Sequence, residues 1–266
     1  MVPKVQPGSC REAESVALVA EILVGRNSVR EALLARRRRI ERVLLAEGVR
    51  ERALIEDILR LCQQAEIPIL RVGRDELDRL SGSLEHQGVA AQASSYPYAD
   101  LAETLALARQ RQEAPFLLAL DSLQDPQNVG SLLRTAEAVG VHGVILPKDR
   151  AVGITPSVSR ASAGAVEHLL VAQVTNLAST LENLKAQGIW VVGLESHPSL
   201  QDYRLADLNM PLVIVLGSEG YGIRRLVAEK CDLLLKLPMR GRINSLNVSV
   251  AGSVLLYQAW SARERV

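Results

Sequence analysis

Cysteine pairs and metal-binding motifs are absent from this sequence. Its three cysteines, Cys10, Cys62 and Cys231, lie far apart and form no CxxC pair, which argues against disulfides and against a zinc site. Its four histidines show no HxxxH or HExxH spacing and no association with a carboxylate cluster. The sequence therefore predicts no metal ion and no Ser-His-Asp chemistry, and we expect the thiols to be buried or idle.

An excess of charge of one sign is also missing. The chain carries 31 basic and 30 acidic side chains, so it lacks the overall positive charge of many nucleic-acid-binding proteins. The local exception is the run "RRRR" at 36–39, which is expected at the end of a helix. Two interpretations of this run are equally open. It can be a solvated helix end, where arginines complement the helix dipole, or a contact with phosphate groups.

Targeting and membrane signals are missing as well. The N-terminal stretch "MVPKVQPGSCREAESV" has no apolar segment of the kind found in secretory signals, so we expect a cytoplasmic protein. Residues 243–262 run without a charge over the length of a membrane span. Their amides and hydroxyls would need hydrogen-bond partners in hydrocarbon, so we interpret the segment as part of a folded domain.

The chain does have enough apolar residues for a large core. With 266 residues, of which 48% are hydrophobic and 23% charged, its length predicts about two domains. We expect a flexible tail over 1–14, a small α/β unit over 15–95, a linker with a polar helix over 96–114 and a second unit over 115–266. In the small unit, apolar runs at 42–48, 67–73 and 88–94 alternate with helical patterns at 27–38, 50–65 and 74–81.

The second unit consists of short, nearly continuous apolar runs separated by helical patterns. The runs occupy 116–121, 143–147, 167–174, 189–194, 212–217 and 232–238. The helical patterns occupy 127–140, 156–164, 176–187 and 222–230, and the uncharged segment follows them. Strands of this kind are buried on both faces, so the alternation predicts an α/β fold with a parallel sheet between two layers of helices. Ligands of such sheets bind beyond the carboxyl ends of the strands.

The loop after the first of these strands reads "DSLQDPQNVGSLLRTAEAVGV". Asn128 stands near the start of the following helix, and Arg134 lies about two helical turns further on. Taken alone, a structural role is the simpler interpretation, because Asn is a favoured capping residue and Arg134 can lie on a solvated face. Arg134 nevertheless flanks the apolar stripe of the helix, and the sequence leaves its direction open.

Two further loops carry unusual residues. The segment "GSEGYGI", 217–223, is a glycine-rich turn that lets a nucleotide-like ligand approach the backbone, but it is neither a GxGxxG motif nor a P-loop. Glu219 in it can be idle or can bind a ligand. In "LPMRGRINSLNVS", 237–249, Ser245 is a candidate N-cap, and the amide of Asn247 can bind a ligand or a neighbouring loop. Small residues at 249–253 allow close helix packing.

In this order and spacing, "DPQNVGSLLRTAEAVGV", "LVIVLGSEGYGI" and "LPMRGRINSLNVSVA" resemble the three signature motifs of the SpoU class of SPOUT RNA ribose 2'-O-methyltransferases. The resemblance covers residues 115–262 and extends more faintly to the small unit through "LEHQGVAA". It is greatest to the branch that methylates a guanosine in the peptidyl-transferase loop of 23S rRNA. In that branch the N-terminal unit is an L30-like RNA-binding domain.

The resemblance implies a C-terminal SPOUT domain whose end threads a deep trefoil knot. It also implies S-adenosyl-L-methionine as the methyl donor, RNA as the substrate and a homodimer formed through the knotted domain. A knot is unusual, because chains rarely thread their own loops. The small residues at 249–253 are compatible with a helix packed inside such a crossing.

Carried over by position, the resemblance gives catalytic roles to Asn128, Arg134, Glu219, Ser245 and Asn247. It implies that the arginine acts near the target ribose and phosphate, that Asn128 and Glu219 hold the geometry of the site, and that the two residues of the third motif position substrate and loop. The family scheme makes the arginine the general base. Because a guanidinium stays protonated, Glu219 or a water is the alternative base, with Arg134 stabilising the forming alkoxide.

The resemblance also predicts the donor-binding residues. Gly217, Leu237 and Leu246 match positions that contact the methyl donor, largely through backbone groups, and we include Gly193 and Leu194 at the end of the neighbouring strand. Alternatives to the leading function are the same chemistry on tRNA or another rRNA site, and a non-catalytic RNA-binding relative. A nucleotide-dependent oxidoreductase is disfavoured by the missing GxGxxG.

Overall fold

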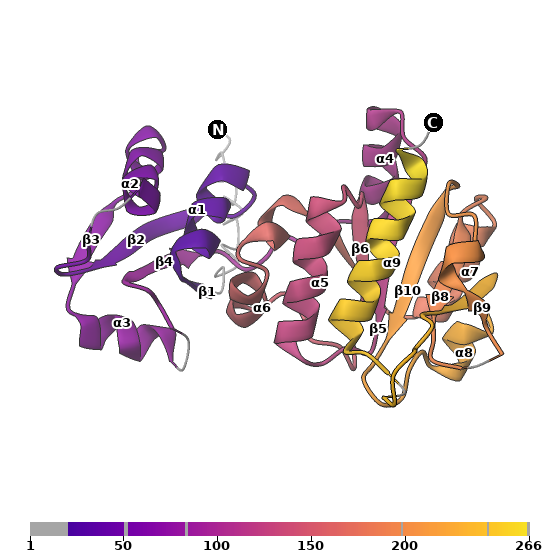
Figure 1. Cartoon of the computed structure of the whole chain (residues 1–266). Helices are drawn as coiled ribbons and strands as arrows, with labels where there is room; N and C mark the ends of the chain where they lie inside the picture. Colours follow the sequence, from indigo (N-terminus) through magenta and orange to yellow (C-terminus); the bar gives the residue numbers. More distant parts are fainter. Residues whose placement is uncertain (1–20, 51–52, 83–84, 198, 244, 265–266) are drawn as a thin grey trace, which may run out of the picture.

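Two separate β-sheets, one in each part of the chain, organise the fold (Figure 1). The structure is a computed structural model and describes residues 21–50, 53–82, 85–197, 199–243 and 245–264. The tail expected over 1–14, with Cys10, lies outside these residues. The smaller N-terminal sheet and the larger C-terminal sheet lie at opposite ends of an elongated molecule (Figure 1).

The small unit is a mixed four-stranded sheet with the order β1-β4-β2-β3. Its elements are β1 (Glu21–Val24), α1 (Arg26–Ala35), β2 (Ile40–Ala46), α2 (Ala53–Gln64), β3 (Ile69–Val72), α3 (Arg74–Ser81) and β4 (Val89–Ala93). Strand β4 is antiparallel to β1 and β2, whereas β3 is parallel to β2. The predicted strands and helices are present. Strand β1 is an addition that the patterns did not reveal, because four residues are too few to display a period.

Helix α1 ends at Ala35 rather than at residue 38, and this decides where the arginine run lies. Arg36 adopts a left-handed backbone conformation with φ 53°, and its N–H bonds to Ala32 O. Residues 37–39 therefore form the connection to β2 and are not part of a helix.

Arg37 and Arg38 join the small unit to the rest of the chain. Arg37 donates to the Tyr96 hydroxyl at 2.9 Å and to two backbone carbonyl groups. Arg38 is fully buried and pairs with Glu167 at 2.9 Å and with Glu21 at 2.6 Å. Both open interpretations of the arginine run are wrong for these two residues, since their guanidinium groups are used inside the protein.

The large unit is a seven-stranded sheet with the order β7-β6-β5-β10-β8-β11-β9, and its described pairings are all parallel. Its strands are β5 (Phe116–Asp121), β6 (Gly143–Pro147), β7 (Val171–Val174), β8 (Trp190–Leu194), β9 (Gln201–Asp202), β10 (Leu212–Gly217) and β11 (Leu233–Lys236). The predicted parallel α/β fold is confirmed. The strand predicted at 167–174 was wrong in part, because the 3₁₀ turn η1 (Ala165–His168) precedes β7. A second such turn, η2 (Tyr203–Leu205), follows β9.

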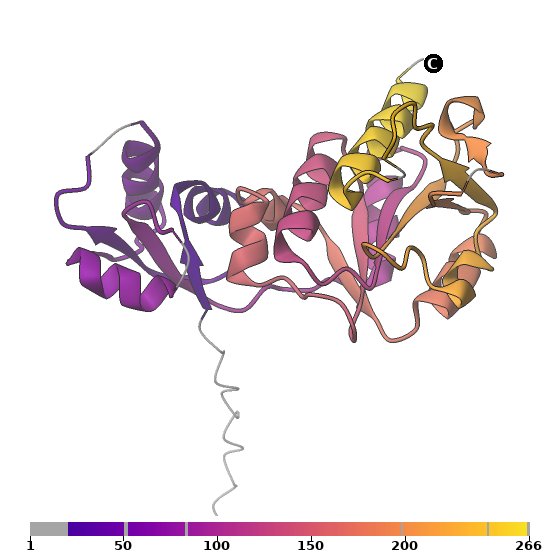
Figure 2. The same ribbon diagram turned by 60° about the horizontal axis from the view of Figure 1, so that its bottom comes forward.

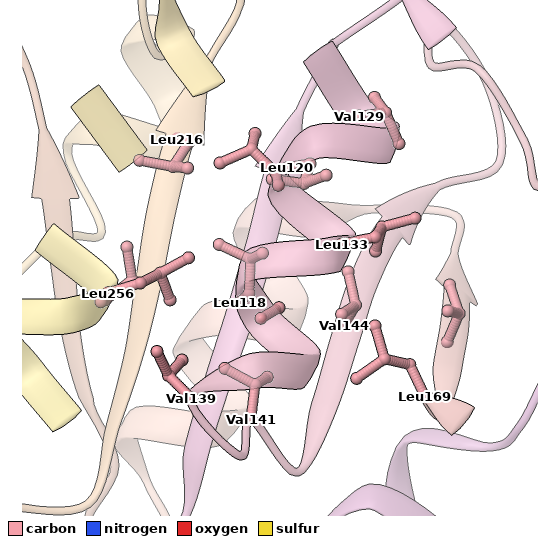
Figure 3. Close-up of a cluster of buried hydrophobic side chains, with 14 of the residues drawn as sticks. Leu118, Leu120, Val129, Leu133, Val139, Val141, Val144, Leu169, Leu216 and Leu256 are labelled. Atoms are coloured by element: carbon pink, nitrogen blue, oxygen red, sulfur yellow. The ribbon is translucent and has the colours of Figure 1, made fainter. Parts of the chain in front are cut away.

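Helices cover both faces of this sheet (Figure 2). One face carries α5 (Pro126–Ala138), α6 (Pro156–Ala161) and α9 (Val248–Arg263), and the other carries α4 (Leu101–Arg111), α7 (Leu177–Lys185) and α8 (Arg225–Ala228). Strand β5 shows why its sequence is continuously apolar. Leu118 and Leu120 pack in the cluster formed with α5 and α9 (Figure 3), whereas Leu117 and Ala119 pack in the cluster formed with α4 and α7.

The helix expected in the linker, α4, packs against the sheet. Thr104, Leu105 and Ala108 are buried. Gly143 of β6 makes room for this helix, because a Cβ at that position would collide with the Thr104 side chain. Residues 101–111 are therefore part of the core of the large unit.

The uncharged segment is divided into a loop and a helix. Helix α9 begins at Val248 and packs on α5 and β10. Gly252 permits this close approach, because a Cβ there would collide with Leu216 and lie 2.7 Å from Leu132 Cδ2. Within the described part of the chain, no helix is both long and apolar enough to cross a membrane.

The path of the chain end is consistent with a threaded terminus. Strand β11 lies between β8 and β9, so the connection from β8 through β9 to β10 runs around it. After β11 the chain returns to pack α9 on β10. The trefoil knot itself stays a prediction.

Candidate functional site

The glycine-rich turn after β10 is held in one tight conformation. Ser218 and Gly222 exchange backbone hydrogen bonds of 3.0 and 2.9 Å. Gly220 and Gly222 have φ angles of 86° and 65°, which glycine adopts without steric cost. At Gly217 a side chain would collide with the backbone of Gly222. The glycines therefore allow the chain to fold back on itself directly beyond the strand.

Two carboxylates from neighbouring strand ends anchor this turn. Asp121, buried at the end of β5, accepts from Arg224 N at 2.8 Å and from the Arg224 guanidinium at 2.7 and 2.6 Å. Glu195, which follows β8, accepts a hydrogen bond from Ile223 N. Charge-assisted bonds of this type are stronger than neutral ones, so the turn is attached to the sheet on both sides.

Asn128, Glu219 and Asn247 meet in one hydrogen-bonded arrangement, which we call the Asn–Glu–Asn triangle. Glu219 Oε1 accepts from Asn128 Nδ2 at 2.9 Å and from Asn247 Nδ2 at 2.7 Å, and Asn247 Nδ2 also donates to Asn128 Oδ1 at 2.8 Å. Glu219 Oε2 accepts no hydrogen bond from the described residues. The triangle therefore orients the carboxylate and leaves one of its oxygens available.

The helix caps differ from the predicted ones. Asp125 caps α5 by accepting from the backbone N–H of Asn128 at 3.0 Å. Asn247 caps α9 through Oδ1, which accepts from Ser249 N at 2.9 Å, so the expectation that Ser245 is the cap was wrong. Because Asp125 takes the capping role, the Asn128 side chain is free to join the triangle. The side-chain oxygen of Asn247 caps the helix, and its side-chain nitrogen donates to Asn128 and Glu219 in the triangle.

A cavity of about 540 Å³ opens beside the triangle. Most of the residues predicted from the sequence line it, namely Leu194, Gly217, Glu219, Leu237, Ser245, Leu246 and Asn247. Gly193 does not line it. A Cβ on Gly193 would lie 2.7 Å from Leu234 Cδ2 and 2.9 Å from Ile223 Cδ1, so this glycine allows close packing inside the core.

A second cavity, of about 450 Å³, lies on the other side of Glu219. Its wall contains Asn128 and Glu219 of the triangle together with the cationic side chains Arg150 and Arg224. Tyr221, which is 95% exposed, lines both cavities, as does Glu219. The Glu219 carboxylate thus stands between a cavity with several apolar side chains and one with cations.

The two cysteines that the structure describes are poor nucleophiles. Burial raises the pKa of Cys62 to about 11 and that of Cys231 to about 12. Both thiols therefore stay protonated near neutral pH, in agreement with the expectation of buried or idle thiols.

Family models match the same two regions that the fold separates. The RNA 2'-O ribose methyltransferase substrate binding model matches residues 22–99. The SpoU rRNA Methylase family model matches residues 115–257, which contain the triangle and both adjoining cavities. The chain belongs to the SpoU rRNA methylase family.

Relatives of this SpoU methylase match it over nearly its whole length. YacO of Bacillus subtilis, assigned to the TrmH family of tRNA/rRNA methyltransferases, is 46% identical over 246 residues, which cover 92% of this chain and 97% of YacO. An rRNA methyltransferase of Sinorhizobium meliloti, solved with AdoMet bound, is 25% identical with a TM-score of 0.72 over 93% of this chain and 88% of that one. The SpoU methyltransferase AviRb of Streptomyces viridochromogenes, at 22% identity, shares the fold with a TM-score of 0.75 over 93% and 92% of the two chains.

Arg134 of this SpoU methylase lies apart from the other predicted catalytic residues. It is exposed on α5 and lines neither of the two cavities. The helical period turns its side chain about 120° away from Asn128 around the axis of α5. A single chain therefore does not bring Arg134 to the triangle.

Several residues that build the SpoU methylase site were missed in the sequence. Asp121 ends the apolar run "FLLALD" and Glu195 follows "IWVVGL", so both stand at the carboxyl ends of parallel strands, where a search for polar residues finds them. Tyr221 and Arg150 carry no such signal. Their importance follows only from the cavities that the folded chain forms.

Proposed function

We propose that this SpoU methylase transfers a methyl group from S-adenosyl-L-methionine to the 2'-hydroxyl of a ribose in RNA, and that its target is a guanosine of 23S rRNA. The observation that carries the proposal is the Asn–Glu–Asn triangle between the two cavities. An oriented carboxylate at that boundary has separate spaces on its two sides for a methyl donor and for an RNA sugar.

The first cavity fits the donor by its chemistry. Leu194, Leu237 and Leu246 offer apolar surface for an adenine ring, and the backbone beyond Gly217 offers N–H and C=O groups for the polar parts. The AdoMet-bound Sinorhizobium meliloti relative supports this assignment. When bound, the donor supplies a methyl group that its sulfonium already activates. The protein must then align the acceptor hydroxyl and remove its proton.

Glu219 is suited to the acceptor side of the reaction. Its Oε1 is occupied by two amide N–H groups, whereas Oε2 can accept a hydrogen bond and then the proton of a ribose 2'-hydroxyl. Asn128 and Asn247 hold the plane of the carboxylate, and the cap made by Asn247 couples it to α9. A pH-rate profile tests this role. Glu219→Gln should lose methyl transfer at every pH while still binding the donor, and normal turnover in this variant would exclude the carboxylate as the base.

We further propose that Arg134 acts in a site completed by a second copy of the chain. Helix α9 carries exposed Tyr257 and Trp260, an apolar face of the kind that homodimers bury. Thr135, next to Arg134, bonds to Ser253 of α9 at 2.8 Å. A dimer formed through α9 would therefore bring Arg134 to the interface, where it can stabilise the forming alkoxide and contact a phosphate.

Mixed dimers distinguish the two possible positions of Arg134. Arg134→Ala and Glu219→Gln chains should each be inactive alone, and the two are co-expressed. If Arg134 acts across the interface, one of the two sites of the mixed dimer has both groups, and activity returns. If Arg134 acts in its own chain, every site of the mixed dimer lacks one group, and activity stays absent.

The RNA target is tested by mapping 2'-O-methyl positions in rRNA and tRNA from cells with and without the gene. Loss of a mark on a 23S rRNA guanosine would support both the proposed reaction and the proposed target. Loss of a mark on tRNA alone would be consistent with the proposed reaction but would contradict 23S rRNA as the target. Both RNAs are mapped because the Bacillus subtilis relative is named for both.

A further inference from the structure

A cavity of about 650 Å³ in the small unit is separate from the two cavities at the triangle. It lies where the start of α1, the loop after β2, the start of α3 and the loop before β4 come together. Arg26, Arg50 and Arg74 reach it from three of these places, and His86 reaches it from the fourth. The small unit occupies the left end of the molecule in Figure 1, away from the methylase sheet.

The acidic side chains in this wall already have partners. Asp78 Oδ1 bonds to His86 Nε2 at 3.0 Å, and Glu85 pairs with an arginine of the large unit at 2.8 Å. Arg50 and Arg74, in contrast, are exposed and form no ion pair with any described residue. The cavity therefore presents two cations whose charge is not compensated within the described structure, which favours binding of an anion.

Described residues of the wall are held together by contacts between Arg26, residues 86–88 and Val49. Arg26 Nε donates to Gln87 O at 3.0 Å, and the Gly88 N–H donates to His86 Nδ1 at 2.9 Å. Gly88 has φ 79°, and a Cβ there would lie 2.8 Å from Val49 Cγ2, so Gly88 packs directly on Val49. A pre-organised wall of this kind loses little conformational entropy when an anion binds.

We infer that this cavity binds the sugar-phosphate backbone of the RNA substrate, with Arg50 and Arg74 as phosphate contacts and Arg26 as a third cation. The inference rests on the proposed function for the choice of RNA among polyanions. It accounts for how a chain with a net charge of only +1 holds RNA, since the cations are concentrated locally. The run at 36–39 is not an equivalent site, because Arg37 and Arg38 are bonded inside the protein.

The salt dependence of RNA binding tests this inference. The full-length Arg50→Ala/Arg74→Ala variant is compared with the wild type by fluorescence anisotropy, using a transcript of the 23S rRNA peptidyl-transferase loop and, separately, unfractionated tRNA. Each lost phosphate contact should reduce the slope of log K against log salt by about 0.7–0.9. Between 50 and 200 mM salt, the wild type should therefore lose affinity by about 7- to 12-fold more than the variant.

A matched control removes the same charge elsewhere. Arg109→Ala/Arg111→Ala changes two arginines of α4, which do not line the cavity, and should leave the slope near that of the wild type. S-adenosyl-L-methionine binding should be unchanged in both double variants, which shows that the methylase unit is intact. Phosphate contacts are independent of sequence, so both RNA probes should respond even if the methylated RNA is not 23S rRNA. An unchanged slope in Arg50→Ala/Arg74→Ala, or an equal drop in the control, would overturn the inference without touching the proposed reaction.

Discussion

Asn247 supports two parts of the site at once, so substitutions that separate its two contacts test the arrangement directly. Its Oδ1 caps α9 by accepting from Ser249 N at 2.9 Å. Its Nδ2 donates to Glu219 at 2.7 Å and to Asn128 at 2.8 Å. Asn247→Ser keeps an oxygen that can cap the helix but removes the amide donor, and Asn247→Ala removes both.

The expected energies follow from these contacts. Asn247→Ser loses two partly exposed hydrogen bonds worth about 0.5–1.5 kcal/mol each, so the free energy of unfolding should fall by about 1–3 kcal/mol. Asn247→Ala also loses the cap, which costs about 1 kcal/mol more. In a chain of this size, 1 kcal/mol corresponds to about 2–4 °C in Tm, so thermal unfolding followed by circular dichroism resolves the two variants.

Methyl transfer should respond differently from stability. Both variants leave Glu219 with a single amide donor, which allows the carboxylate to turn out of line. A displacement of about 1 Å in an aligned site costs roughly 100-fold, so both variants should lose about that factor in kcat/KM. Transfer of a radiolabelled methyl group to RNA measures this loss.

Asn176 provides a matched control for the cap. It caps α7, outside the walls of both cavities, by accepting from Ser179 N at 3.2 Å. Asn176→Ala should cost about 1 kcal/mol of stability and no activity. Full activity in Asn247→Ser would refute the role of the triangle, and equal stability of Asn247→Ser and Asn247→Ala would refute the role of the cap.

Three further predictions concern the framework around the site. Glu167→Ala should cost about 1.5–3 kcal/mol in a urea titration, because it removes a charge-assisted hydrogen bond from the buried guanidinium of Arg38, which keeps Glu21 as its other partner. Arg39→Ala, at a side chain 70% exposed, should stay within about 0.5 kcal/mol. Burial lowers the pKa of His142 below the ordinary value of 6.5, so the folded chain binds this proton less readily than the unfolded chain. The contribution of His142 to the free energy of unfolding should therefore be fully present above pH 6.5 and be lost as the pH falls below it. His142→Asn should reduce the change in Tm between about pH 7.5 and pH 5.5. Gly252→Val should cost about 1–3 kcal/mol, since its side chain would meet leucines of β10 and α5, and an unchanged Tm would contradict the close packing of α9.

Much of the large unit could be predicted from short-range patterns. A strand buried on both faces is continuously apolar, so "FLLALD" and "LVIVLG" indicate β5 and β10 without any knowledge of their partners. Short elements and local interruptions of a pattern were harder to predict. Strand β1 has only four residues, and η1 lies in an apolar run whose Glu167 is buried and pairs with Arg38. No local pattern reports such a pairing between distant segments.

The residue types of the site were also readable, but their individual contacts were not. Asn128, Glu219 and Asn247 could each be identified as polar residues in the segments that follow strands. Which polar residue caps a helix could not be predicted from residue type. Asp125 rather than Asn128 caps α5, and Asn247 rather than Ser245 caps α9. Gly193, which we predicted at the donor site, packs against core side chains and does not line the cavity.

The sequence by itself determined the parallel α/β class, the glycine-rich turn and the identity of the loops that form the site, because backbone preference and burial on two faces act over a few neighbouring residues. Only the tertiary structure decided which atoms meet. Asn128 lies 91 positions from Glu219 and 119 from Asn247, and their hydrogen bonds exist only after the strands have brought the start of α5, the glycine-rich turn and the start of α9 together. The same holds for charge, since packing placed Arg38 in a buried ion pair and left Arg50 and Arg74 facing a cavity.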